Sequence, residues 1–329
     1  MTMKKLIVLA GLIFFLNGCS TGQMLKNSFQ GNRYLDNKDY RQGELVFRDN
    51  VAQDPDDALA NYYLGRFLLA QEKPRQALPY LQKAASLDQS KIDYLFWQGR
   101  AQGAAGDLRT ERASYQKVLR INEKHIPALT YLGHNQFKQK EYKSAQATYT
   151  KVLTLQPNSP SALFNKALLA RILKHPKEER AGWLAYLRKY PAGDFAVKAT
   201  GYLNLSGDFS YQIHQIGEQE IALPRVEFQP LTAKLTSTSL GSLNVAGMAA
   251  TKMKDRKLQV VVFQRNNKNL AKARAISIRQ YLLEKFPTLT PERIGVSWFG
   301  EPEKTVIQGA KIRNPESVRF FFTDLKKGK

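Results

Sequence analysis

The strongest constraint on the fold is a period of 34 residues that runs from Gly31 to Pro191. Small residues recur at this spacing: Gly31, Gly65, Gly99, Gly133 and Ala167. Bulky residues form a second set with the same period: Phe47, Leu81, Tyr115, Tyr149 and Trp183. Such a period predicts copies of one supersecondary unit that stack because none of them can bury its apolar face alone.

The pattern resembles the tetratricopeptide repeat, as shown by Leu64-Gly65, Ala77, Leu81 and Ala84 in the second copy. The resemblance implies two antiparallel helices of about a dozen residues in each copy, with the small residue allowing close approach and the bulky one filling the gap to the next copy. We expect five repeats over residues 24–191 and a solvent-facing capping helix over 192–205. The first helices of copies two to five should begin at Ala58, Ile92, Ile126 and Pro160.

In this family the first helices line a concave groove that binds proteins. The resemblance therefore implies a partner groove formed by Tyr62, Arg66, Phe96, Arg100, His134, Phe137, Phe164 and Arg171. Arginine forks carboxylates and stacks on aromatic rings, so this set suits an extended or helical peptide of acidic character. The alternative is that most of these side chains pack against helices of the next copy.

The start of the chain has the pattern of an export signal. Lys4 and Lys5 precede an apolar run over residues 6–16, which is shorter than the roughly twenty residues that span a bilayer. The run ends at Leu16-Asn17-Gly18-Cys19, which contains the one cysteine of the chain and resembles the lipobox of bacterial lipoproteins. The resemblance implies a signal peptide over 1–18, an acylated Cys19 and a short tether over 19–23. Because Ser20 replaces the usual inner-membrane aspartate, we expect the periplasmic face of the outer membrane.

A second domain is expected after a linker or strand over residues 206–220. Residues 221–228, 258–263, 294–299 and 318–322 read as strands, and residues 236–253 and 269–286 as helices. This order predicts an α/β domain over 221–325, with helices on one face of a mixed sheet. The predicted fold class is therefore multidomain: an all-α repeat superhelix followed by an α/β domain.

One helix of this domain resembles that of the OmpA-like peptidoglycan-binding family through Asn267, Leu270, Arg274-Ala275, Ile278 and Tyr281-Leu282. The resemblance implies that Arg274 grips a carboxylate of the wall peptide, with Asn267 and Arg265 nearby. The chain departs from the family at two places. The loop over 264–267 has no aspartate, and Asn314-Pro315-Glu316-Ser317-Val318 stands where the family has N-R-R-V. Either the pocket binds the wall more weakly or by another group, or the domain contacts protein.

The sequence offers no constellation for catalysis. The four histidines are scattered without a second ligand at metal-binding spacing, and neither a phosphate-binding loop nor a nucleophile elbow is found. We therefore expect no enzyme activity, no metal and no cofactor. The formal charge of +22 suits anionic surroundings, but an exported lipoprotein would rarely meet nucleic acid.

The leading hypothesis is an outer-membrane lipoprotein that scaffolds an envelope machine, such as a tight-adherence pilus or a secretion system. The repeats would capture a protein, Cys19 would hold the lipid, and the last domain would contact peptidoglycan. Two alternatives stay open: a general envelope tether whose repeats are a spacer, and an accessory activator of a wall-remodelling enzyme.

Overall fold

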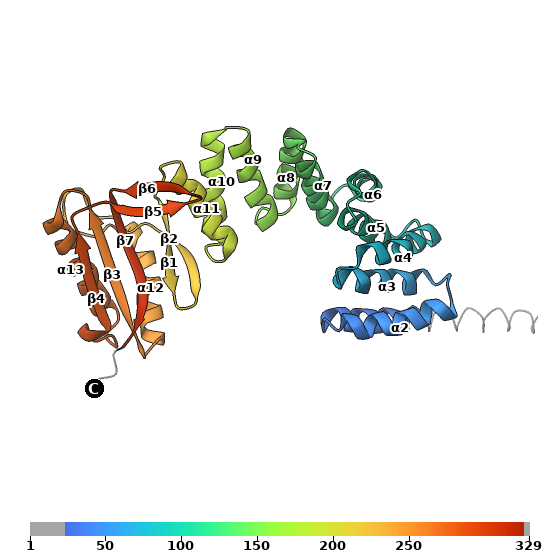
Figure 1. Cartoon of the computed structure of the whole chain (residues 1–329), viewed down its shortest axis with the longest axis horizontal. Coiled ribbons are helices and arrows are strands. Elements are labelled where there is room, and N and C mark those ends of the chain that lie inside the picture. The colour runs from blue at the N-terminus through green and yellow to red at the C-terminus, as the bar shows by residue number, and fades with distance from the viewer. Residues whose placement is uncertain (1–23, 326–329) are drawn as a thin grey trace, which may run out of the picture. The chain divides into compact units, whose positions relative to one another are not determined.

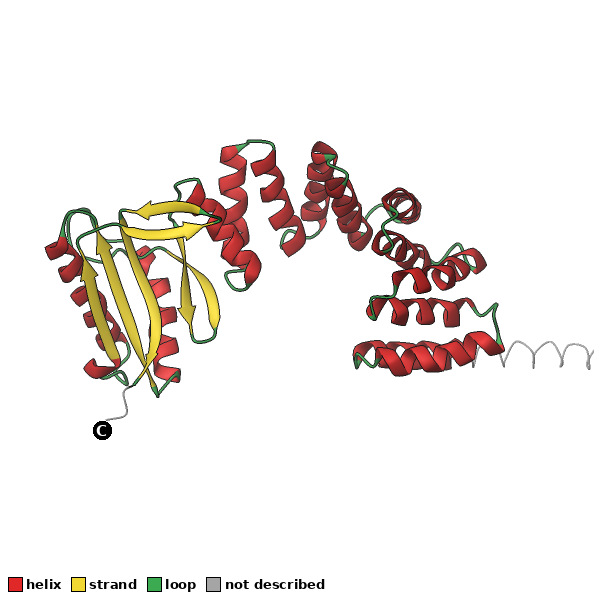
Figure 2. Ribbon diagram, in the orientation of Figure 1, coloured by secondary structure: helices red, strands yellow, loops and turns green. Residues whose placement is uncertain are grey.

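A computed structural model describes residues 24–325, which form two compact units over 24–157 and 158–325 (Figure 1). The predicted signal peptide, Cys19 and the tether lie outside the described residues. Within 24–325, no helix has both the length and the apolar character needed to cross a membrane. The first unit contains helices joined by turns and no strand among its described residues, whereas the second unit contains both helices and strands (Figure 2).

The first unit is a series of helical pairs. Residues 24–36 are helical, and the helices that follow are α2 (Tyr40–Gln53), α3 (Ala58–Ala70), α4 (Pro74–Leu87), α5 (Ile92–Ala104), α6 (Leu108–Ile121), α7 (Ile126–Lys138) and α8 (Tyr142–Leu155). The predicted first positions Ala58, Ile92 and Ile126 are the observed starts of α3, α5 and α7. The Asp57 carboxylate fixes one of these starts because it accepts hydrogen bonds from the N–H groups of Leu59 and Ala60, each at 2.9 Å.

The turn inside each pair also repeats every 34 residues. It contains one residue of positive φ, and these residues are Lys38, Glu72, Gly106, Lys140 and Lys174. In the second copy, the Glu72 N–H donates to Leu69 O at 3.0 Å and the Lys73 N–H to Leu68 O at 2.9 Å. This left-handed closure of a helix end satisfies carbonyls that would otherwise lack partners. The same backbone device therefore recurs in five copies.

The periodic glycines lie against the periodic bulky residues of the same copy, whereas the sequence predicts that the bulky residue fills the gap to the next copy. A Cβ added to a glycine of the first helix would come within 2.4–2.8 Å of the bulky side chain of the second helix in three pairs: Gly65–Leu81, Gly99–Tyr115 and Gly133–Tyr149. Distances this short leave no room for a methyl group. The bulky residue thus packs on the glycine of its own copy, and Tyr115 also contacts Tyr131 of the next copy at a centroid distance of 6.1 Å.

The second unit begins with helices α9 (Pro160–Ile172), α10 (Pro176–Lys189) and α11 (Asp194–Leu205). The prediction of α11 as a solvent-facing cap is wrong. Its face of Ala196, Ala199 and Leu203 is fully buried and shares a core with Ala222 of a strand. The small alanines let a β-hairpin approach the helix closely, so α11 is an internal packing element.

The predicted linker over 206–220 is mostly strand. β1 (Tyr211–Ile216) pairs antiparallel with β2 (Gln219–Pro224) through a tight turn at Gly217, whose φ is +64°. Alternation along β1 buries Gln212, His214 and Ile216. The strand predicted over 221–228 starts two residues earlier and ends at Pro224.

The core of the second unit is a three-stranded mixed sheet of order β4-β3-β7. β3 (Arg256–Gln264) runs parallel to β4 (Ile294–Phe299) and antiparallel to β7 (Glu316–Asp324). Helices α12 (Leu240–Lys252) and α13 (Lys268–Lys285) share one apolar core with Leu258, Val260 and Val262 of β3, so both cover the same face. The predicted fold class is confirmed.

A second hairpin was not expected. β5 (Glu303–Ile307) pairs antiparallel with β6 (Ala310–Asn314) around a turn in which Gln308 and Gly309 have positive φ. A short 3-10 turn (Ser237–Ser239) precedes α12, and another (Pro291–Arg293) precedes β4.

Candidate functional site

Two arginines of the first unit stack on aromatic rings across successive first helices. The guanidinium of Arg66 on α3 lies 4.2 Å from the ring centre of Trp97 on α5, and its Nη1 donates to the Tyr62 hydroxyl at 3.0 Å. Arg100, also on α5, lies 3.9 Å from the ring centre of Tyr131 on α7 and 5.5 Å from that of Trp97. Positive charge and aromatic faces therefore alternate, and we call Arg66, Trp97, Arg100 and Tyr131 the arginine ladder.

The charges of the ladder are not neutralised within the described chain. Among the ion pairs of residues 24–325, none involves Arg66 or Arg100. Both side chains are half-buried, and the Nε of Arg66 is buried without a hydrogen-bond partner. Stacked guanidinium groups keep their in-plane N–H donors free for a planar acceptor. The ladder can thus receive carboxylates from outside the chain.

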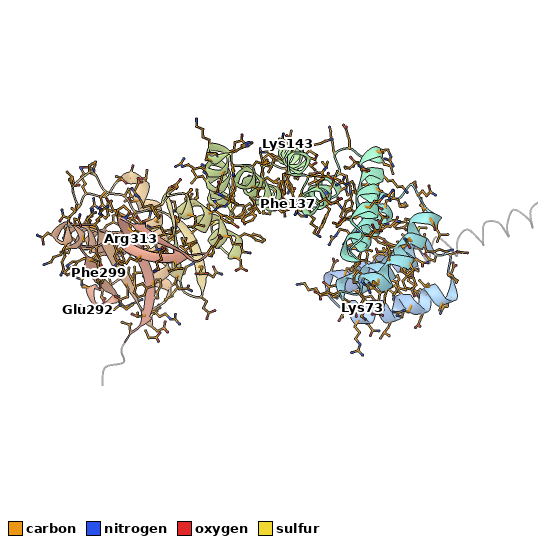
Figure 3. The ribbon with its side chains drawn as sticks, turned by 45° about the horizontal axis from the view of Figure 1, so that its top comes forward. Lys73, Phe137, Lys143, Glu292, Phe299 and Arg313 are labelled. Carbon is orange, nitrogen blue, oxygen red and sulfur yellow. The ribbon has the colours of Figure 1, made fainter. Side chains whose placement is uncertain are left out.

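The other predicted groove residues are placed differently. Tyr62, Phe96 and Phe164 are 6%, 7% and 7% exposed and belong to the apolar cores. Phe137, near the end of α7 (Figure 3), packs on Tyr142. These contacts match the packing alternative that the sequence left open.

Arg171 also has internal partners. It pairs with Glu179 at 2.8 Å, and its guanidinium lies 4.8 Å from the ring centre of Tyr202. Of the predicted groove set, only Arg66 and Arg100 are therefore half-buried cations without a carboxylate among the described residues.

Sequence reasoning missed Trp97 and Tyr131 as members of the ladder. The signal was present, because Tyr63, Trp97 and Tyr131 are 34 residues apart, as are Arg66, Arg100 and His134. The first helices α3, α5 and α7 thus each carry an aromatic residue followed three positions later by a basic one, and positions three apart lie on the same helix face.

His134 occupies the third basic position and is uncharged at neutral pH. Burial, with smaller effects of the nearby Lys138 and Arg100 charges, lowers its pKa to about 4. Its ring lies against Tyr131 and Tyr149, at centroid distances of 5.4 and 5.8 Å. The charge of this surface at neutral pH therefore comes from the arginines.

The low pKa of His134 predicts a loss of stability in mild acid. Because the native pKa lies below the ordinary value of 6.5, the unfolded chain takes up the proton first as the pH falls, and stability is lost between about pH 6.5 and 4. At pH 5 the expected loss is on the order of 1–2 kcal/mol, measured by chemical denaturation. His134→Gln should remove this part of the pH dependence and leave the parts due to His125, whose pKa burial also lowers, and to His214 of the second unit, whose pKa burial lowers to about 3. An unchanged pH profile in the variant would contradict the assignment.

In the second unit, Arg274 is buried among its own partners and is not open to a ligand. Its side chain is 3% exposed, and Nη1 pairs with Glu316 at 2.9 Å. It also donates to Gln264 Oε1 and, through Nε at 3.0 Å, to Thr232 O, while the guanidinium lies 4.5 Å from the Phe228 ring centre. A carboxylate of the chain itself therefore occupies the position in which a ligand carboxylate was expected.

The two other predicted wall-binding residues lie at the start of α13. The Asn267 side chain caps this helix by accepting from the Leu270 N–H at 2.9 Å. Arg265 is exposed, and its backbone N–H donates to Pro315 O at 2.8 Å. Arg265 and Asn267 are thus both exposed, whereas Arg274 is buried, and of the two exposed side chains only that of Arg265 carries a charge. No cluster of three or more His, Cys, Asp or Glu residues that could hold a metal is found within 24–325.

Comparison with known protein families finds a repeat family whose model matches residues in the helical pairs. A family model for the tetratricopeptide repeat matches residues 30–91 and 132–194. The helical pairs within these two ranges are tetratricopeptide repeats. Such repeats stack into extended surfaces that bind other proteins, so the chain carries a scaffold for protein–protein interaction. A search of curated proteins finds no match.

Solved structures of other proteins resemble parts of the chain at low identity. Pseudomonas aeruginosa PilF is 17% identical, with a TM-score of 0.51, over 56% of this chain and 84% of that one. MamA is 18% identical, with a TM-score of 0.45, over 48% and 93%. YrrB, a tetratricopeptide protein with an unusual peptide-binding site, is 15% identical, with a TM-score of 0.45, over 52% and 88%. At 17% identity the likeness to PilF concerns the fold alone.

Proposed function

We propose that the chain is a scaffold whose tetratricopeptide repeats bind an acidic segment of a partner protein through the arginine ladder. The observation that carries the proposal is the pair of stacked guanidinium groups of Arg66 and Arg100, which have no carboxylate partner among the described residues. Charge-assisted hydrogen bonds to carboxylates are about twice as strong as neutral ones. An acidic partner would supply the acceptors that the chain itself does not provide.

A photo-crosslinking residue in place of the exposed Asp93, on the same helix as Trp97, tests this function in the full chain within intact envelopes. A crosslinked partner that disappears when Arg66 and Arg100 are both changed to glutamate would support capture at the ladder. A partner that crosslinks equally well to that variant would contradict it. A crosslinker at the exposed Arg109 on α6 serves as the control position.

The cellular setting is part of the same proposal. The chain would be held at the periplasmic face of the outer membrane by acyl groups on Cys19, because the apolar run and the lipobox-like ending precede it. There it would support an envelope machine such as a tight-adherence pilus or a secretion system, an analogy drawn from other repeat lipoproteins. Metabolic labelling with a fatty-acid analogue tests the anchor, since a Cys19→Ala chain that still took up the label would exclude it.

Peptidoglycan contact by the C-terminal domain is the second part of the proposal. It rests on the motif of α13 and on the accessible Arg265, while Arg274 already pairs with Glu316. We therefore place protein capture first, with the domain as a second point of attachment and no catalytic role for either unit. Retention of the chain on purified sacculi at low salt measures the wall contact directly.

A further inference from the structure

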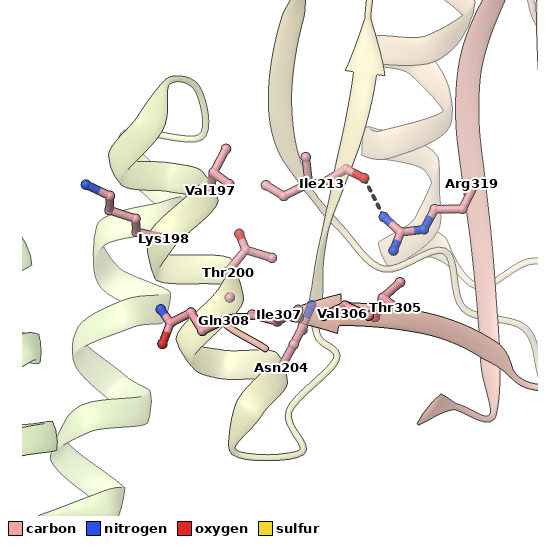
Figure 4. A pocket seen from close by; sticks show the side chains of 11 residues that line it. Val197, Lys198, Thr200, Asn204, Ile213, Thr305, Val306, Ile307, Gln308 and Arg319 are labelled. Carbon is pink, nitrogen blue, oxygen red and sulfur yellow. Dashed lines mark hydrogen bonds between the residues drawn. The ribbon is translucent and has the colours of Figure 1, made fainter. Parts of the chain in front are cut away.

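A cavity of about 380 Å³ lies in the second unit between α11, β1 and the end of β5 (Figure 4). Val197, Ile213 and Ile307 give it apolar walls, and Arg319 of β7 closes one side. Arg319 is held in place because it donates to Glu303 Oε1 and to Ile213 O, each at 2.5 Å. Two hydrogen bonds therefore hold the side of the cavity that Arg319 forms.

Two polar atoms of α11 on this cavity lack partners. Thr200 is 1% exposed, and its hydroxyl makes no hydrogen bond. The Oδ1 atom of Asn204, one turn further along, is also buried without a partner. A buried polar group left unpaired costs about 1–3 kcal/mol, so such groups are uncommon unless something else satisfies them. A ligand that carries N–H groups would do so.

The strand that lines the cavity has a free edge. Among the described strands, β5 pairs only with β6. A two-residue turn joins Ile307 to Ala310, so the backbones of these two residues form a hydrogen-bonded pair. Because hydrogen-bonded and non-hydrogen-bonded pairs alternate along an antiparallel ladder, the next pair, Val306 and Lys311, is not hydrogen-bonded. The N–H and C=O of Val306 therefore point away from β6. Its side chain is 70% exposed, and an exposed apolar edge strand is a template for another strand.

The hairpin around this edge is basic. Lys304, Lys311 and Arg313 are exposed, and no acidic residue occurs between positions 304 and 314 (Figure 3 labels Arg313). Lys304 pairs with Glu301 at 3.5 Å, whereas Lys311 and Arg313 form no ion pair within the described residues. Lys198 adds a further exposed cation on the cavity. The charge favours an occupant with acidic side chains.

We propose that β5 and the cavity bind an extended acidic segment of a partner protein by strand addition. The main chain of the segment pairs with Val306, an apolar side chain enters the cavity, and acidic side chains meet the surrounding cations. Peptide N–H groups satisfy Thr200 and Asn204. Strand addition takes its affinity from main-chain hydrogen bonds and its specificity from pockets for alternate side chains. This site is separate from the arginine ladder and does not depend on it.

Binding of a labelled peptide of alternating aspartate and valine tests the proposal, in a full chain that also carries Arg66→Glu and Arg100→Glu so that the ladder cannot take up the probe. Val306→Pro removes an N–H that makes no bond to β6, and proline is tolerated on an edge strand. We expect the affinity of this variant for the peptide to be lower than that of the parent by a factor of about ten or more. The matched variant Val306→Thr keeps the N–H and should bind like the parent.

Three outcomes would overturn the proposal. The first is equal affinity of the Val306→Pro and Val306→Thr chains at equal thermal stability. The second is equal affinity for a peptide with lysine in place of aspartate. The third is concentration-dependent dimerisation that Val306→Pro abolishes, which would assign the edge to a second copy of the chain. Thr200→Val gives independent support if it weakens binding several-fold without changing the circular dichroism spectrum.

Discussion

A chain in which Arg66 and Arg100 are both glutamate should bind acidic peptides at least roughly 100-fold more weakly than the parent. Each arginine can form charge-assisted hydrogen bonds with a carboxylate, contributing about 1.5–3 kcal/mol. Glutamate both removes this gain and repels the ligand. Fluorescence anisotropy with a labelled peptide of alternating glutamate and leucine measures the change. To remove the contribution of the β5 edge, both chains carry Val306→Pro.

The matched control is a chain with Arg75→Glu and Arg109→Glu. Both residues are exposed, lie on the second helices α4 and α6, and form no ion pair within the described residues. The control changes the net charge by the same amount, so equal weakening in both chains would show a general charge effect and contradict the ladder. Lysine at positions 66 and 100 should give an intermediate affinity, because it keeps the charge but loses the planar stack on Trp97 and Tyr131. Loss of stability should stay near 1 kcal/mol for each lost cation–π contact.

The repeat fold could be predicted because its period reports contacts made inside one copy. Gly99 and Tyr115 recur at fixed spacing because the Tyr115 ring packs on the backbone at Gly99, and the starts of the first helices follow from the same register. Placement around the helix was harder. Phe96 and Trp97 differ by one position, which turns the side chain by about 100°. That step separates a core residue, 7% exposed, from a member of the ladder.

Partners that are distant in sequence could not be predicted. The pattern of α11 shows that Ala196 and Ala199 face something, but not that a hairpin covers them. The hairpin of β5 and β6 was not predicted because an exposed edge strand, such as the one that contains Val306, shows no alternation of apolar and polar residues. Arg274 was recognised from its own helix, whereas its partner Glu316 lies 42 residues further along the chain, and no local pattern connects the two.

Replacing Arg274 by methionine should lower the free energy of unfolding of the second unit by about 3 kcal/mol. The change leaves Glu316 without its cation and Gln264 and Thr232 O without a donor, and breaking a buried pair from one side typically costs about 3–5 kcal/mol. The lower figure applies because the Glu316 side chain is 31% exposed and can be partly rehydrated. Hydrogen exchange of β3 and β7 amides in the full chain measures the loss. Unchanged exchange together with lost sacculus binding would instead show that Arg274 is a ligand-binding residue.

Glu316 separates these two roles from the other side of the pair. Glu316→Gln keeps an acceptor for Arg274 and should cost less than Glu316→Ala, which leaves a guanidinium that is 3% exposed without a carboxylate. If Glu316 stands in for a ligand carboxylate, the alanine variant gains an empty anion-binding subsite at Arg274, and its retention on sacculi at low salt should rise above that of the parent and of the glutamine variant. Retention that is equal in all three chains would mean that the pair only stabilises the domain. Any wall contact would then have to come from surface groups such as Arg265.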